Sequence, residues 1–303
     1  MELNWLLFQS FELLGKVPRS WTETNIVIFP KKGKDPLLCG SFQPISLIYA
    51  DSKIYKCVLA NELATLISDL VAKNQHSFVP GRDTTAHVNT VITALEASRA
   101  HGNLVGPIML DAEKAFDRIL WPFLCATVAA SRFSLHFTAR VQQLHQNIMA
   151  RVSCLGSSTD LIQINCSTCH ECPLFPLLFV IYINRHIRAL ISLRDITPLR
   201  IHQLEFKVLA YADDHTILTS APEDSLVVFE DVASKYGAIS EYKRNLDKTV
   251  VLGEDIDCST NACLDYLQRG PPKKDIRWAY KLILAAKVQQ QLDIFQTMAE
   301  EWS

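Results

Sequence analysis

Two adjacent acidic residues interrupt an apolar stretch, and this feature limits the possible folds more than any other in the sequence. Residues 208–218 read VLAYADDHTIL, so Asp213 and Asp214 lie between two short apolar runs. Short apolar runs on both sides of a polar pair predict a β-hairpin with the pair at its tip. Aspartate is also a common turn residue, so the pair taken alone fits a hairpin without any further function.

A second apolar run, residues 107–110, ends in an acid at Asp111. A strand that ends there, beside a hairpin with Asp213 and Asp214 at its tip, would gather three carboxylates at one point. Hard cations such as Mg²⁺ prefer oxygen ligands of this kind, and two such ions about 4 Å apart promote phosphoryl transfer. Like charges this close repel unless a cation lies between them. The sequence therefore predicts Asp111, Asp213 and Asp214 as metal ligands and catalytic residues.

The rest of the chain predicts a mixture of helices and strands without repeats. Strands are expected at residues 25–29, 107–110, 207–211 and 216–219. Helical spacing of apolar residues predicts helices at 54–70, at 88–102, within 121–149 and from 222 to about 236. The sequence SAPE at 220–223 predicts a capping box for the last of these. The apolar run at 174–183 is too short for a membrane span and predicts a buried helix segment.

Length, net charge and cysteine count limit the class of protein more broadly. A length of 303 residues with 49% hydrophobic residues suits a globular chain with a sizeable core. A net charge of −2 is less basic than that of a typical nucleic-acid binder, although a local basic groove remains compatible with it. An odd count of nine cysteines and no secretory signal predict reduced thiols and an intracellular location, nuclear or cytoplasmic.

The two acidic stretches resemble the catalytic motifs of reverse transcriptases from non-LTR (LINE-type) retrotransposons. LDAEKAFDR at 110–118 is similar to the first motif, and YADD at 211–214 to the second. Other blocks of the family follow in the same order: IFPKKGKDP at 28–36, PISL at 44–47, DSKI at 51–54, FVPGR at 78–82, CPLFPLLF at 172–179 and NLDKT at 245–249. The resemblance covers residues from about 15 to about 250.

The resemblance implies a right-hand polymerase of the α+β class, with an antiparallel palm sheet and packed helices. Fingers and palm would occupy residues 1–252. Residues 253–274 contain a Pro-Pro pair and few apolar residues, which predicts a linker, and 275–303 predict a helical tail, a remnant of a truncated thumb. A polymerase with an incomplete thumb implies a partner chain that supplies the missing domains.

The implied function is that of an RNA-directed DNA polymerase. Asp111, Asp213 and Asp214 would hold two Mg²⁺ ions. An RNA template, a DNA primer and deoxynucleoside triphosphates are the implied partners, and no membrane is involved. The primer 3′-hydroxyl would attack the α-phosphate of the incoming nucleotide.

The resemblance also implies residues that bind the nucleotide. Phe116 is the expected steric gate against a ribose 2′-hydroxyl, and Lys248 matches a lysine that approaches the triphosphate. Lys31 belongs to a basic cluster expected to contact template or triphosphate. The residues alone also fit simpler roles: a core aromatic for Phe116, a surface lysine for Lys248 and a solvated loop for the cluster.

Several substitutions depart from the family pattern and suggest impaired activity. Gln43 replaces an arginine that contacts the triphosphate, and a neutral amide cannot replace a bidentate cation. The other departures, at places where the family has Gly or Gln, are Ser77, Ser167, His170, Glu171 and Glu241. They favour an alternative function: a catalytically inactive reverse-transcriptase-derived domain that binds nucleic acid or a protein partner.

A third hypothesis concerns zinc. Cys166, Cys169, His170 and Cys172 are closely spaced soft ligands that suit a zinc site. Cys172 is also expected from the family match, and small buried cysteines need no metal.

Overall fold

The protein is described by a computed structural model over residues 2–35, 37–82, 85, 87, 89–91, 93–94, 106–154, 156–167, 172–201, 204–245 and 249–251. The predicted linker at 253–274 and the predicted tail at 275–303 lie outside these described residues. So do Cys169, His170, Glu171 and Lys248.

A four-stranded antiparallel sheet contains the acidic stretches, and we call it the palm sheet. Its order is β11 (Val250–Val251), β3 (Gly106–Leu110), β10 (Asp214–Thr219) and β9 (Val208–Tyr211). The central strand β10 pairs antiparallel with both β3 and β9. Its consecutive residues Ile217 and Leu218 are both buried, so both faces of this strand are covered. The strands predicted at 107–110, 207–211 and 216–219 are confirmed.

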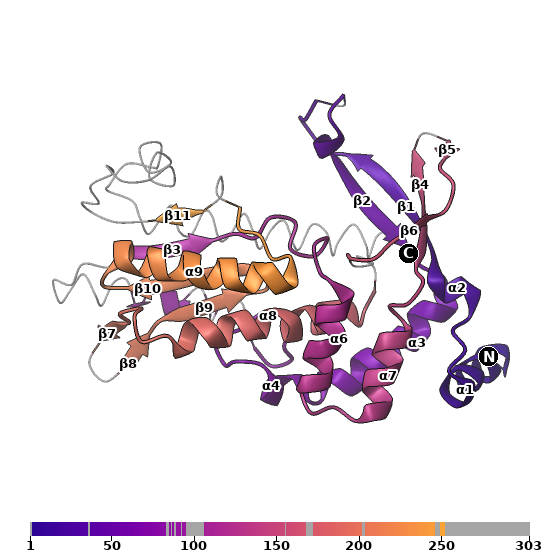
Figure 1. The fold of residues 1–303 in the computed structure, drawn as a ribbon, viewed down its shortest axis with the longest axis horizontal. Helices are drawn as coiled ribbons and strands as arrows, with labels where there is room; N and C mark the ends of the chain where they lie inside the picture. The colour runs from indigo at the N-terminus through magenta and orange to yellow at the C-terminus, as the bar shows by residue number, and fades with distance from the viewer. Residues whose placement is uncertain are drawn as a thin grey trace.

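Two long helices lie along the palm sheet (Figure 1). Helix α8 (Phe175–Ser192) packs against β9, and α9 (Pro222–Ser240) packs against β3. Among the described helices, α8 alone is long and apolar enough to cross a membrane, but 61% of it is buried inside the protein. The buried helix segment predicted at 174–183 is therefore confirmed as part of α8.

A second sheet rises away from the helices (Figure 1). Strand β1 (Glu23–Pro30) pairs antiparallel with β2 (Phe42–Leu47) and parallel with β4 (Met149–Cys154). Two short strands, β5 (Ser157–Ser158) and β6 (Ile162–Gln163), pair with β4. The strand predicted at 25–29 is confirmed within β1. We call the β1–β2 pair, with the turn that joins it at η1 (Cys39–Ser41), the fingers hairpin.

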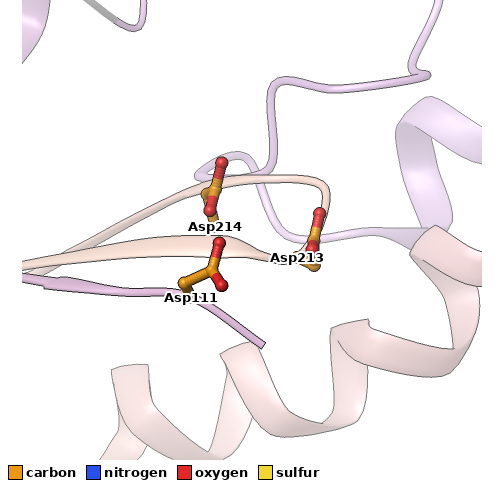
Figure 2. Close-up of side chains that lie close together, drawn as sticks. All are labelled: Asp111, Asp213 and Asp214. Carbon is orange, nitrogen blue, oxygen red and sulfur yellow. The ribbon is translucent and has the colours of Figure 1, made fainter. Parts of the chain in front are cut away.

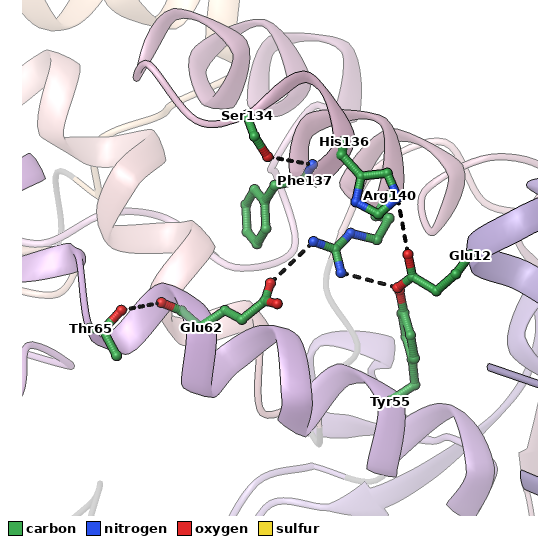
Figure 3. A network of polar contacts seen from close by, with 8 residues as sticks. All are labelled: Glu12, Tyr55, Glu62, Thr65, Ser134, His136, Phe137 and Arg140. Atoms are coloured by element: carbon green, nitrogen blue, oxygen red, sulfur yellow. Dashed lines mark hydrogen bonds and ion pairs between the residues drawn. The ribbon is translucent and has the colours of Figure 1, made fainter. Parts of the chain in front are cut away.

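Helices at the base of the molecule are joined by a partly buried ion-pair network (Figure 3). Arg140 of α7 (Leu135–Gln143) pairs with Glu12 of α1 (Glu2–Leu14) at 3.1 Å and with Glu62 of α3 (Ala50–Ala64) at 3.2 Å. The Tyr55 hydroxyl donates to the same Glu12 carboxylate. Only 12% of the Arg140 side chain is exposed, so this pairing ties three segments distant in sequence together.

The other predicted helices are confirmed in part. Residues 54–70 form α3 and α4 (Ile67–Leu70), and 121–149 contain α6 (Trp121–Ala130) and α7. The break before α7 is explained by Ser134, whose hydroxyl caps the helix by accepting from the Phe137 N–H at 3.1 Å. The described residues among 85–94 are helical. The remaining described elements are α2 (Arg19–Thr22), β7 (Leu199–Ile201) and β8 (Leu204–Phe206).

The capping box predicted at 220–223 is wrong, although the helix that it introduces is present. Ala221 occupies the N-cap position and has no side-chain cap. The Thr219 hydroxyl instead accepts from the Ala221 N–H at 3.1 Å and lies 2.7 Å from the Ser225 hydroxyl. The buried Thr219 of β10 therefore provides the hydroxyl at the start of α9 that was predicted for Ser220. The helix continues to Ser240, past the predicted end at about residue 236.

The end of α9 offers a test of backbone strain. Glu241 is exposed and adopts the left-handed conformation, with φ 59° and ψ 12°. A β-carbon is unfavourable there by about 1 kcal/mol. We expect Glu241→Gly to raise the free energy of unfolding by about 1 kcal/mol, measured by urea denaturation. Glu241→Ala removes the carboxylate but keeps the β-carbon, so it should not give this gain; equal stability of the two variants would contradict the strain argument.

Candidate functional site

The palm sheet brings the three predicted acids together. Asp111 follows the last residue of β3, Asp213 lies in the β9–β10 turn and Asp214 begins β10. Because His215 pairs with Leu110, the next step of the same register places Asp214 level with Asp111. One ligand oxygen from each of the three carboxylates lies within 4.8 Å of the other two. Figure 2 shows the three side chains grouped at this end of the sheet.

The donor set of this triad suits a divalent cation. Asp111 is buried, with 7% of its surface exposed, and Asp213 and Asp214 are half-buried. Carboxylates at such distances repel each other by a few kcal/mol per pair at an effective dielectric of about 20. A hard cation removes that repulsion and takes oxygen ligands by preference. The three carboxylates therefore fit Mg²⁺ by the chemistry of their donors.

Tyr242 lies near the triad and approaches α9 closely at a glycine. Burial raises the pKa of Tyr242, and the negative charge of Asp213 raises it further, so its phenol keeps its proton. A β-carbon on Gly237 would lie 2.5 Å from the Tyr242 carbonyl oxygen. Only glycine at 237 in α9 therefore allows the segment after the helix to approach this closely.

The segment after Tyr242 fixes the backbone around Asp111. The Asn245 N–H donates to the Asp111 carbonyl at 2.8 Å, and the Glu113 N–H donates to the Lys243 carbonyl at 2.7 Å. Lys243 and Arg118 each pair with the Glu113 carboxylate at 3.2 Å. Burial by itself raises the pKa of Glu113, but the hydrogen bonds from Lys243 and Arg118 outweigh burial and lower it. Asp111 is thus held by β10 on one side and by this segment on the other.

Phe116 lies against the core. Its ring stacks on that of Phe179 in α8, with centroids 4.4 Å apart and an interplanar angle of 27°. Phe179 is buried, whereas Phe116 is half-buried. The packing fits both interpretations of Phe116, since a core aromatic and a steric gate each need a fixed ring.

Of the other two residues predicted to bind the nucleotide, Lys31 belongs to the fingers hairpin, and Lys248 lies outside the described residues. Lys31 follows β1 in the fingers hairpin, is exposed and donates from Nζ to the Gly40 carbonyl at 3.1 Å. Gln43, on β2, is exposed and opposite Phe29. The fingers hairpin and the palm sheet are separate units of the fold (Figure 1). The roles of Lys31 and Lys248 remain predictions.

Two of the substituted glycine positions show why the family has glycine there. Ser167 adopts φ 88° and Glu241 adopts φ 59°. Both values lie in the region that favours glycine. Ser77 is different, since its N–H donates to the Gln75 side chain in the core. His170 and Glu171 lie outside the part of the chain that the structure describes.

The zinc hypothesis remains a prediction, because Cys169 and His170 are not described. Of the two zinc-candidate cysteines that the structure describes, Cys166 and Cys172, only Cys172 is buried, and burial raises the pKa of its thiol. A raised pKa disfavours the thiolate that zinc requires.

Sequence reasoning missed a further residue beside the triad. Gln75 is buried, and its side chain bonds to the backbone of Ala212 in the β9–β10 turn. The two residues are 137 positions apart, so no local pattern connects them. The only signal was a polar residue just before the FVPGR block.

Comparison with known proteins identifies the family. The family described as reverse transcriptase (RNA-dependent DNA polymerase) matches residues 29–269, which includes most of the predicted linker. The chain is 27% identical over 271 residues to the transposon TX1 uncharacterized 149 kDa protein of Xenopus laevis, covering 89% of this chain and 20% of that protein. It is 26% identical over 220 residues to the RNA-directed DNA polymerase from mobile element jockey of Drosophila melanogaster, covering 71% and 23%. The chain thus spans about a fifth of the length of these relatives.

Solved structures show the same fold. Apo telomerase from Candida tropicalis, truncated from its C-terminal domain, superposes with a TM-score of 0.56 at 15% identity, covering 81% of this chain and 52% of that one. Telomerase from Candida albicans gives 0.55 at 11% identity, covering 84% and 46%. The α+β polymerase fold, with an antiparallel palm sheet and packed helices, is confirmed. The chain belongs to the reverse transcriptase (RNA-dependent DNA polymerase) family, and the resemblance of its motifs to the non-LTR, LINE-type members is confirmed.

Proposed function

We propose that this reverse transcriptase domain is catalytically competent and extends a DNA primer on an RNA template. The observation that supports this most directly is the intact triad, with ligand oxygens of Asp111, Asp213 and Asp214 within 4.8 Å of one another. Keeping three carboxylates this close is costly without a cation. A fold that keeps them together is therefore best explained by metal-dependent chemistry.

The three acids would hold two Mg²⁺ ions, which supply activation of the attacking hydroxyl and stabilisation of the leaving oxygen. In the reaction, the primer 3′-hydroxyl attacks the α-phosphorus of a deoxynucleoside triphosphate. A new P–O bond forms, the bond between the α-phosphorus and the oxygen that bridges to the β-phosphate breaks, and pyrophosphate leaves with that electron pair, while the hydroxyl proton passes to water. The pairing of Leu110 with His215 places the adjacent residues Asp111 and Asp214 level with each other, so these carboxylates need little reorganisation during the step.

The nucleotide is proposed to lie between the palm sheet and the fingers hairpin. Phe116 would face the sugar, and Lys31 and Lys248 would approach template or triphosphate. We infer that a partner chain contributes to holding primer and template. The six described cysteines are free thiols, which supports an intracellular location.

Primer extension tests this proposal. The protein is incubated with an RNA template, an annealed DNA primer, Mg²⁺ and deoxynucleoside triphosphates, and the product is resolved by length. Extension supports the proposal. A folded protein that binds the template–primer by fluorescence anisotropy but does not extend it supports the alternative, an inactive domain that binds nucleic acid. The specific observation that favours this alternative is Gln43, which is exposed on β2 where the family has arginine.

Restoring that arginine gives a direct prediction. Gln43→Arg should lower the KM for deoxynucleoside triphosphates by about ten-fold or more, since a hydrogen bond to a charged group contributes about 1.5–3 kcal/mol. Steady-state primer extension at varied nucleotide concentration measures this change. Gln43→Lys adds the charge without the planar fork of arginine and should gain less. An unchanged KM in both variants would mean that position 43 does not face the triphosphate.

A further inference from the structure

We propose that Gln75 is a positioning residue for the β9–β10 hairpin, whose side-chain amide fixes Ala212 and thereby aims the Asp213 carboxylate at the metal site. The inference rests on the proposed function of the triad. It adds a residue outside both acidic motifs, on a different segment of the chain.

Two of the three hydrogen bonds of the Gln75 side chain join it to Ala212. Its Oε1 accepts from the Ala212 N–H at 3.0 Å, and its Nε2 donates to the Ala212 carbonyl at 3.2 Å. Oε1 also accepts from the Ser77 N–H at 3.0 Å. Gln75 and Ala212 are both buried, with exposures of 0%. A single side chain therefore satisfies both backbone polar groups of Ala212 where water cannot replace it.

Ala212 needs this support because its backbone is strained. Tyr211 pairs with Asp214, so Ala212 and Asp213 form a two-residue turn between the strands. Such turns follow the strand twist when the backbone takes positive φ, and glycine or asparagine is the usual residue. Ala212 adopts φ 53° with a β-carbon. A conformation of this kind persists when the surrounding structure over-determines it, and here the Gln75 amide does so.

The segment around Gln75 is itself fixed to β9. The His76 N–H donates to the Ala210 carbonyl at 2.9 Å, and the Ala210 N–H donates to the Asn74 carbonyl at 2.8 Å. The Asn74 side chain donates to the Val208 carbonyl at 2.6 Å. Residues 74–76 thus form a parallel bridge along the outer edge of β9. The register of this bridge places Gln75 beside the turn.

Further hydrogen bonds connect the segment around Gln75 to Arg82 and to helix α8. Arg82 donates to the carbonyls of Gln75 and Ala72, each at 2.6 Å, and to that of Ser68 at 2.9 Å. Asn184 of α8 accepts from the Ala72 N–H at 2.8 Å. The segment that carries Gln75 is therefore joined to α8 by hydrogen bonds.

Loss of the Gln75 contacts should affect the position of Asp213 more than that of Asp111 or Asp214. Asp111 directly follows Leu110, the last paired residue of β3, and Asp214 is a paired residue of β10, so neither lies in the turn that Gln75 contacts. Asp213 lies in the turn and directly follows Ala212, so its direction depends on the Ala212 backbone. Without the amide, Ala212 is released toward negative φ, and Asp213 turns away from the other two carboxylates. Loss of Gln75 should therefore weaken metal binding at the triad with a smaller effect on the rest of the fold.

Mn²⁺ binding tests this without requiring polymerase activity. Isothermal titration on the full chain compares wild type with Gln75→Met, which keeps the side-chain length and removes both polar atoms. We expect an affinity at least about ten-fold weaker. Thr219→Val is the matched control, because it removes a buried hydroxyl at the other end of β10. It should lower the melting temperature and leave Mn²⁺ affinity unchanged.

A rescue separates positioning from general stability. Gln75→Met combined with Ala212→Gly should return the affinity to within about three-fold of wild type, since glycine adopts positive φ without support. The double variant also serves if Gln75→Met alone does not fold. Unchanged affinity in Gln75→Met, equal weakening in Thr219→Val, or a folded double variant that stays weak each overturns the role of Gln75. If wild type binds Mn²⁺ no better than Asp213→Asn, the metal site itself fails, and with it both proposals.

Discussion

Asp213→Asn should reduce primer extension on an RNA template by at least about a hundred-fold. Asparagine keeps the size of the side chain and removes its charge, so the loss is one of electrostatic stabilisation and metal coordination. Asp213 lies in the β9–β10 turn and takes part in none of the strand pairs of the palm sheet, so the variant should fold normally. Single-turnover extension measures the effect on the chemical step.

The same variant should be more stable than wild type when divalent cations are removed. Neutralising one carboxylate relieves its repulsion with the other two, by a few kcal/mol at these distances. Added Mg²⁺ should raise the melting temperature of wild type and have little effect on the variant. Asp231→Asn is the control, since Asp231 is an exposed residue on α9 paired with Lys235. A similar Mg²⁺ response in all three proteins, or full activity of Asp213→Asn, would remove the triad from the mechanism.

The strands of the palm sheet were predictable because their signal is local. The apolar runs on either side of Asp213 and Asp214 specify a hairpin through period and turn chemistry alone. The start of α9 was not predictable in the same way. Its cap depends on Thr219, a buried residue of the preceding strand, and the hydroxyl reaches the helix only after the chain has folded.

The residues of the candidate site were likewise predictable only where their signal is local. The three acids are adjacent to strong local patterns, and the order of the family motifs aligns them from the amino-acid sequence alone. The contact between Gln75 and Ala212 spans 137 positions and depends on a side chain that has no pattern of its own. The positions at which this chain lacks a glycine of the family pattern were predictable in part. The family pattern marked Ser167 and Glu241, and the positive φ of both gives the physical reason.

Phe116→Val should raise the incorporation of ribonucleotides relative to deoxynucleotides by about a hundred-fold. A shaped apolar wall rejects an added hydroxyl by about this factor when no polar partner is offered. The wall must be rigid to do so. Phe116 stacks on Phe179 with a centroid distance of 4.4 Å, and Phe179 is 1% exposed, so the ring is supported by the core on that face. The ratio of kcat/KM for matched ribo- and deoxynucleotides on one RNA template measures the change.

Phe123→Val distinguishes a gate from ordinary packing. Phe123 is also half-buried, and it packs edge-on against Tyr182 of α8 at 5.3 Å, in the same aromatic cluster as Phe179. Both variants remove a similar aromatic contact and should lower stability by a similar amount. Only Phe116 belongs to the 110–118 motif that contains Asp111. Only Phe116→Val should therefore change the discrimination between ribose and deoxyribose. If both variants discriminate as wild type does, Phe116 is a core aromatic, and the selection against the 2′-hydroxyl arises from another residue.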